Sequence, residues 1–200
     1  MSDILCVTNR ALCRGDFLRR LERIAAAGCA GILLREKDLP PAEYRDLARR
    51  VMALCARYDT PCILHGFAPV AAQLGARALH LPLPALQALP EGERARFAVL
   101  GASCHSVDQA RQAQALGCTY LTAGHVFATG CKPGLPPRGL DFLRDVCRVS
   151  SVPVWAIGGV RPDNFAAVRA AGARGGCVMG ALMTCEDPAD LLAAFDRAAG

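Results

Sequence analysis

The sequence contains no apolar stretch that approaches the length of a membrane span, and neither a basic start nor a cleavage site precedes the apolar run Ile4–Val7. It also has no basic run interleaved with aromatic residues. The 23 basic and 18 acidic residues give a net charge of +5, but the arginines are spread along helical segments. We therefore expect a soluble, cytoplasmic protein that binds neither membrane nor nucleic acid, and the modest positive charge favours anionic ligands.

The cysteines lack the pattern of a disulfide or zinc framework. Their number is odd, eleven, and no C-x-x-C pair occurs. Cys6, Cys62 and Cys177 lie inside apolar strand-like runs, where a reduced cysteine behaves as a small core hydrophobe. A reducing compartment is the natural setting for such a chain.

Strand-like runs alternate regularly with amphipathic segments of helical length, which predicts β-α units and parallel strands. Glycine recurs where a helix stops and the next strand begins, at Gly28, Gly75, Gly117 and Gly172, because glycine adopts the left-handed conformation that ends a helix. The expected strands cover residues 4–8, 31–35, 62–64, 78–80, 99–101, 119–122, 153–157 and 176–179. Eight such units in 200 residues, 52% of them hydrophobic, predict an α/β protein with one domain, a minimal (β/α)8 TIM barrel over residues 1–200.

An open doubly wound sheet is the alternative fold, but its usual Gly-x-Gly-x-x-Gly turn is missing, and residues 8–11 read Thr-Asn-Arg-Ala instead. In a TIM barrel the chemistry gathers at the carboxyl ends of the strands. The four histidines, His65, His80, His105 and His125, each follow a strand-like run, so we expect them at that end of the barrel. They come from four separate loops without a carboxylate partner, which disfavours a transition-metal site.

Two glycine-containing turns predict phosphate binding. Gly158 and Gly159 follow the seventh strand, and Met179 and Gly180 follow the eighth. Glycine lets backbone N–H groups approach an anion, and a following helix start adds a favourable dipole. The alternative is that these glycines only make tight turns.

Charged residues cluster after the second strand, where Arg35-Glu36-Lys37-Asp38 places two cations and two anions in four residues. Such a cluster either clamps a carboxylate or phosphate or forms a solvated helix cap, and composition favours neither.

The loop after the sixth strand, residues 122–139, is the longest in the chain. Its glycines and prolines, together with Thr129 and Lys132, are typical of an active-site lid. His125 lies at its root and is a candidate for acid–base chemistry, because imidazole titrates near neutral pH.

Together these segments resemble the thiamine phosphate synthase superfamily over nearly the whole chain. The matching motifs are Arg35-Glu36-Lys37, Ser103 with His105, the pattern from Gly124 to Gly134, Ala156-Ile157-Gly158-Gly159 and Val178-Met179. The superfamily has two branches on one TIM barrel: a synthase that joins a pyrimidine pyrophosphate to a thiazole phosphate using Mg²⁺, and a TenI-type thiazole tautomerase. The resemblance implies a small phosphorylated thiazole as substrate and leaves homo-oligomerisation open.

The synthase motifs that hold Mg²⁺ are missing. The resemblance places them after the third and fourth strands, where this chain has His65-Gly66 and residues 80–85, with no carboxylate in either place. Mg²⁺ prefers oxygen ligands, so we expect no metal site and no cofactor, with Mg²⁺ required only for the synthase alternative.

The tautomerase branch matches better at Gly124-His125-Val126-Phe127 and at residues 129–132, Thr-Gly-Cys-Lys. This resemblance implies an isomerase in thiamine biosynthesis that converts a non-aromatic carboxythiazole phosphate to the aromatic form, with His125 as the catalytic acid–base residue. Two alternatives stay open: a thiamine phosphate synthase, and a non-catalytic regulatory protein that binds a thiamine-related phosphate.

The same resemblance assigns Arg35 and Lys37 to anion binding, with no choice between them for the substrate carboxylate. The other expected substrate contacts are Ser103, His105, Thr129 and Lys132.

Overall fold

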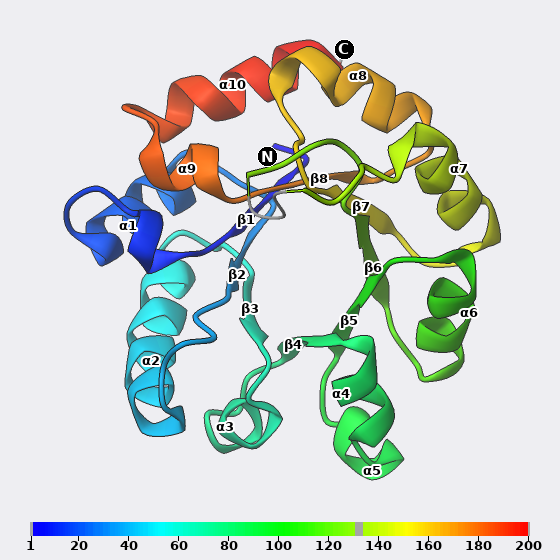
Figure 1. Ribbon diagram of the computed structural model, residues 1–200. Coiled ribbons are helices and arrows are strands. Elements are labelled where there is room, and N and C mark those ends of the chain that lie inside the picture. Colours follow the sequence, from blue (N-terminus) through cyan, green and yellow to red (C-terminus); the bar gives the residue numbers. More distant parts are fainter. Residues whose placement is uncertain (1, 131–133, 200) are drawn as a thin grey trace.

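Eight parallel strands close into a barrel in the computed structural model, which describes residues 2–130 and 134–199. Figure 1 shows the strands as an inner ring surrounded by helices. Each strand pairs with its neighbours in sequence, and β1 closes the ring on β8, where Leu5 is the partner of Cys177. The predicted TIM barrel is therefore confirmed.

The strands are β1 (Ile4–Val7), β2 (Gly31–Leu34), β3 (Cys62–His65), β4 (Ala78–Pro82), β5 (Val99–Cys104), β6 (Tyr120–Gly124), β7 (Val154–Ile157) and β8 (Gly175–Val178). The helices are the 3-10 helix η1 (Arg10–Leu12), α1 (Phe17–Ala26), α2 (Pro41–Arg57), α3 (Ala68–Gln73), α4 (Leu83–Ala88), α5 (Glu91–Arg94), α6 (Val107–Ala115), α7 (Gly139–Val149), α8 (Pro162–Ala170), α9 (Gly180–Thr184) and α10 (Pro188–Ala199). None of the helices in the described part of the chain combines the length and apolar character needed to cross a bilayer.

Local sequence signals set the ends of these helices. Ser106 caps α6 by accepting a hydrogen bond from the N–H of Gln109 at 3.1 Å, and the Gln109 side chain accepts one from the N–H of His105 at 2.8 Å. Pro162 and Pro188 are the first residues of α8 and α10. The four glycines predicted to end helices all have the left-handed conformation, with φ between +64° and +94°.

Apolar side chains pack in two layers, because successive side chains of a strand point to opposite faces. Ile4 and Ile32 contribute to the core between the sheet and the helices, together with helix residues such as Phe165 and Phe195. The second cluster contains only strand residues and fills the interior of the barrel: Leu5, Val7, Leu33, Ile63, Ala78, Tyr120 and Cys177. The barrel is therefore a packed core up to the level of these residues.

Two strand glycines make room inside the barrel for large rings. A Cβ atom at Gly101 on β5 would collide with the ring of Tyr120 on β6, and a Cβ atom at Gly175 on β8 would collide with the ring of Trp155 on β7. A glycine inside a strand often marks such a close approach. At these two places a large ring on one strand therefore occupies the space beside a glycine on the neighbouring strand.

The strand ends place the four histidines at two different depths. His65 is the last residue of β3, in contrast to the prediction that it follows this strand, and His80 is the middle residue of β4, which continues past its predicted end at residue 80. The run Ala78–Leu79 was too short to indicate that β4 extends to Pro82. His105 and His125 lie directly after β5 and β6, as predicted.

Replacement of Gly101 by alanine is expected to lower the free energy of unfolding by roughly 1–3 kcal/mol, because the added methyl group must displace the Tyr120 ring. Urea denaturation measures this change. Gly92→Ala in α5 is the matched control: no atom lies within 4 Å of its added Cβ, and alanine favours a helix. Equal stability of the two variants would contradict this account of the barrel interior.

Candidate active site at the carboxyl end of the barrel

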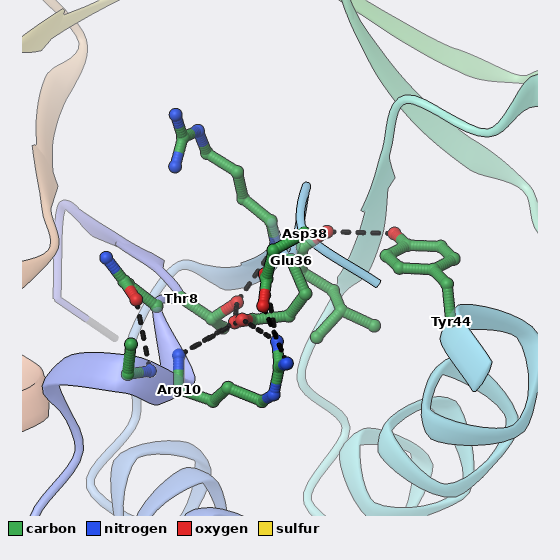
Figure 2. A network of polar contacts seen from close by, with 9 residues as sticks. Thr8, Arg10, Glu36, Asp38 and Tyr44 are labelled. Atoms are coloured by element: carbon green, nitrogen blue, oxygen red, sulfur yellow. Dashed lines mark hydrogen bonds and ion pairs between the residues drawn. The ribbon is translucent and has the colours of Figure 1, made fainter. Parts of the chain in front are cut away.

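A buried carboxylate joins the ends of β1 and β2. Glu36 is 2% exposed and accepts hydrogen bonds from the Thr8 hydroxyl at 2.6 Å and from the backbone N–H of Arg10 at 3.1 Å. The Arg10 guanidinium contacts the same carboxylate at 3.2 Å and binds Asp38 through two nitrogens, at 2.9 and 2.6 Å. Figure 2 shows Arg10 reaching both acidic side chains. The two anions of the 35–38 cluster are thus held by one arginine.

The two cations of that cluster differ in their surroundings. The guanidinium of half-buried Arg35 makes no hydrogen bond or ion pair with any residue that the structure describes, and its backbone N–H donates to the Thr8 hydroxyl at 2.9 Å. Lys37 is exposed. The Arg10 guanidinium holds the pKa of Asp38 below its usual value, so this carboxylate stays charged and paired with Arg10. The alternative that residues 35–38 only form a solvated helix cap does not explain why the Glu36 side chain is buried.

His65 lies in the field of these cations. Burial, followed by the charges of Arg35 and Lys37, lowers the pKa of His65 to about 4, so the ring is neutral at physiological pH. Its backbone N–H donates to the hydroxyl of Tyr44 at 3.0 Å, and this hydroxyl donates to the carbonyl of Leu34 at 2.8 Å. The Tyr44 side chain from α2 points toward β2 in Figure 2 and ties the ends of β2 and β3 together.

A second polar group lies between β4, β5 and β6. The two ring nitrogens of His80 contact the Tyr120 hydroxyl at 2.8 Å and the Ser103 hydroxyl at 2.9 Å. The Thr122 hydroxyl donates to Ser103 at 3.4 Å. His80 also stacks on His65, with ring centroids 5.6 Å apart. Ser103, predicted as a substrate contact, is therefore the half-buried end of a buried network.

His105 and His125 hold the ends of β5 and β6. The Nδ1–H of His105 donates to the carbonyl of Gly124 at 2.6 Å. His125 is 6% exposed; its Nδ1 has no hydrogen-bond partner among the described residues, and its Nε2 lies 3.4 Å from the carbonyl of Leu135. The backbone N–H of Arg138 donates to the carbonyl of His125 at 3.0 Å, which draws the two ends of the long loop together.

The turn after β7 packs against the start of the long loop. Gly158 and Gly159 have φ values of +95° and +66°, and a Cβ atom at either would collide with His125 or Phe127. Their N–H groups make no hydrogen bond to any residue in the described ranges, and both residues are partly exposed. The glycines therefore satisfy a packing demand and also leave N–H donors for an anion. Met179 and Gly180, after β8, are placed beside this turn by the pairing of β7 with β8.

The remaining predicted contacts lie in the long loop. Thr129 is part of the described chain, and it follows Phe127 and Ala128, which contact the turn after β7. Lys132, predicted to contact the substrate, lies outside the described residues.

The described residues do not fit a bound Mg²⁺ ion. Among residues 2–130 and 134–199, no group of three or more histidine, cysteine, aspartate or glutamate side chains could hold a metal. The buried carboxylate Glu36 already has Thr8 and Arg10 as partners. A hard cation needs several oxygen ligands, and the resemblance places those ligands at His65-Gly66 and within residues 80–85, where this chain has no carboxylate.

The chain is similar to thiamine-phosphate synthases in sequence and in structure. The family model described as thiamine monophosphate synthase matches residues 4–182. A thiamine-phosphate synthase from Salinispora arenicola is 44% identical over 159 residues, which cover 76% of this chain and 74% of that protein. Another from Thermus thermophilus is 38% identical over 173 residues, or 86% and 83% of the two chains. The solved structure of a thiamine phosphate pyrophosphorylase from Pyrococcus furiosus has a TM-score of 0.83 at 25% identity and covers 98% of this chain and 94% of its own.

The interpretation as a thiazole tautomerase, and with it the class isomerase, is wrong. The relatives at 38% and 44% identity are named thiamine-phosphate synthase, which is a transferase. The Gly124-His125-Val126-Phe127 motif misled the sequence interpretation because its residues are constrained by contact with the turn after β7, whatever the reaction. The role of His125 in that isomerisation falls with it, whereas acid–base chemistry at His125, which its place at the root of the long loop indicates, stays a prediction.

Sequence reasoning missed Thr8, Arg10 and Tyr120 as parts of the site. Thr8 and Arg10 follow the first strand, and a barrel places that strand end beside the 35–38 cluster. Gly101 inside a predicted strand was the available signal for Tyr120, since it marks the space that a large ring fills.

Replacing Glu36 by alanine is expected to lower the free energy of unfolding by about 2–4 kcal/mol, because it leaves the buried Thr8 hydroxyl and the partly buried N–H of Arg10 without their acceptor. Urea denaturation provides the measurement. The control is Asp38→Ala, which removes the exposed partner of the same arginine and should leave stability nearly unchanged. A similar loss in both variants would show that Glu36 has no special role.

Stability should also fall with acid through His65. The folded pKa of about 4 lies below the unfolded value of about 6.5, so the neutral ring's contribution is present above pH 6.5 and is lost between there and pH 4. Between pH 7 and pH 5 the wild type should lose about 2 kcal/mol that His65→Gln does not lose. Urea denaturation of both proteins at the two pH values measures the difference, and parallel losses would refute it.

Proposed function

The chain belongs to the thiamine monophosphate synthase family, and we propose that it is a thiamine-phosphate synthase, a transferase that joins a pyrimidine pyrophosphate to a thiazole phosphate and releases inorganic pyrophosphate. The observation that carries the proposal is the pairing of Arg10 with Glu36 and Asp38. It neutralises the acidic side chains after β2 and leaves the Arg35 guanidinium to attract substrates that both carry phosphate groups.

Each predicted contact has a place in this proposal. Arg35 and Lys37 bind the diphosphate from the β2 side, and the Ser103 hydroxyl binds it from the end of β5. The N–H groups of Gly158 and Gly159, with those of Met179 and Gly180, bind the phosphate of the thiazole on the opposite side of the barrel. His105 supports the end of β6, while Thr129 and Lys132 contact the ligand from the long loop.

The chemical requirement of the reaction is stabilisation of a departing diphosphate. Negative charge grows on this group as its bond to the pyrimidine breaks, so fixed cations lower the barrier when they are positioned before the reaction. Arg35 has no partner among the described residues that competes for its charge. We assign no step to Mg²⁺, because the described residues do not fit it.

A second candidate function is binding of the same phosphates without turnover. The observation that favours it is the lack of a metal-binding group among the described residues. Cationic side chains alone can bind a diphosphate. To accelerate the reaction, they must stabilise the departing diphosphate in the transition state more than they stabilise the bound substrate. The two functions differ in whether product forms.

The direct test is formation of thiamine phosphate from the pyrimidine pyrophosphate and the thiazole phosphate, measured in MgCl2 and in EDTA. The wild type should form product, and Arg35→Ala should lower kcat/KM by about tenfold or more, since a hydrogen bond to a charged group is lost. Arg49→Ala, which removes an exposed arginine of α2 paired with Asp46, should leave the rate unchanged. No product in either buffer would overturn the synthase proposal, and saturable binding of both substrates would then favour the second candidate.

A further inference from the structure

Three side chains from neighbouring strands form one hydrogen-bonded line inside the barrel. His80 on β4 pairs in register with Gly101 on β5, and Gly101 pairs with Tyr120 on β6. Gly101 has no side chain, so the Tyr120 ring occupies the space over it and its hydroxyl lies 2.8 Å from Nδ1 of His80. Ser103 lies two residues beyond Gly101 on the same face of β5, and its hydroxyl is 2.9 Å from Nε2 of His80.

The direction of these hydrogen bonds follows from Tyr120. Its side chain is 6% exposed, and His80 is the hydrogen-bond partner of its hydroxyl in the described part of the chain. A buried hydroxyl whose proton has no acceptor is costly, so Tyr120 donates to Nδ1 of His80. A hydrogen bond in the other direction would leave the Tyr120 proton without an acceptor.

The direction of the Tyr120–His80 hydrogen bond determines the direction of the hydrogen bond between His80 and Ser103. Burial, followed by the neighbouring His65, lowers the pKa of His80 well below its usual value, so the ring is neutral. A neutral imidazole has one donor and one acceptor. Because Nδ1 accepts from Tyr120, Nε2 carries the proton and donates to Ser103.

Ser103 therefore receives hydrogen bonds from inside the protein. Its oxygen accepts from Nε2 of His80 and, at 3.4 Å, from the hydroxyl of Thr122. These two hydrogen bonds occupy both lone pairs of the Ser103 oxygen. Ser103 can therefore contact a ligand through its own hydroxyl proton. We propose that Tyr120 and His80 are positioning residues that fix Ser103 as a hydrogen-bond donor, so that the site selects an unprotonated phosphate oxygen at this point.

That the ligand is a phosphate rests on the proposed function. The positions of the protons on Tyr120, His80 and Ser103 follow from the hydrogen bonds alone. A serine with a free choice of direction would accept a protonated ligand group equally well. A serine fixed as a donor discriminates against such a group, because two donors would then face each other.

Nitrogen NMR of protein labelled with ¹⁵N-histidine tests the proton arrangement, with His80→Asn to assign the ring. At pH 7 the wild type should show an unprotonated Nδ1 and a protonated Nε2 for His80. Tyr120→Phe keeps the ring shape and removes the donor, so its His80 signals should move toward the other tautomer. A protonated Nδ1 in the wild type, or unchanged signals in the variant, would overturn the proposal.

Calorimetric titration with inorganic pyrophosphate tests the consequence for binding. Tyr120→Phe and Ser103→Ala should each weaken affinity roughly tenfold, and Tyr120→Phe should add nothing in the Ser103→Ala background. Tyr58→Phe, which removes a hydroxyl that donates to Glu22 on the outer surface at 2.9 Å, is the matched control and should bind as the wild type does.

If Tyr120→Phe weakens the affinity for pyrophosphate by the same factor in the wild type and in Ser103→Ala, the proposed coupling between Tyr120 and Ser103 is wrong. Absence of pyrophosphate binding by the wild type would instead overturn the proposed function and the choice of ligand, and the NMR spectrum would still decide the proton arrangement.

Discussion

The space inside a closed barrel of short strands constrains the rest of this structure. Two of the largest rings fit there because the neighbouring strand has no side chain: Tyr120 lies beside Gly101, and Trp155 lies beside Gly175. The first of these pairs brings a phenol into contact with a histidine two strands away, and this contact determines which groups the serine at the barrel's end presents. Packing at the middle of the barrel and chemistry at its end are thus parts of one arrangement.

Charge at the carboxyl end is arranged by one residue outside the predicted motifs. Arg10 satisfies a buried and an exposed carboxylate, so the anions of the 35–38 cluster are structural, while the Arg35 guanidinium makes no hydrogen bond or ion pair with any described residue. The charges of Arg35 and Lys37 also disfavour protonation of His65, so its ring is neutral at physiological pH. A positive charge next to a neutral ring, with the neighbouring carboxylates paired to Arg10, favours an anionic ligand over a cationic one.

The sequence was sufficient to predict the barrel, its parallel strands and the helix-ending glycines, because these follow from local periodicity and backbone preference. It also placed Arg35, Ser103 and Gly158 at the correct end of the barrel, since the fold alone brings strand ends together. The Arg10–Glu36 pair and the Tyr120–His80–Ser103 line were not predicted, because they depend on which side chains meet across strands. The branch assignment failed for a related reason: a missing metal motif and a packing motif were both interpreted as signs of a different reaction.

The long loop between β6 and α7 is fastened at both ends. Arg138 and Gly139 donate backbone hydrogen bonds to His125 and Val126, so the chain leaves the barrel and returns to it at nearly the same point. An insertion between Ala128 and Arg138 leaves these two hydrogen bonds and the contacts of Phe127 with the turn after β7 in place. The length of the loop is thus independent of the strands that carry it, so this segment can vary without a change in the barrel.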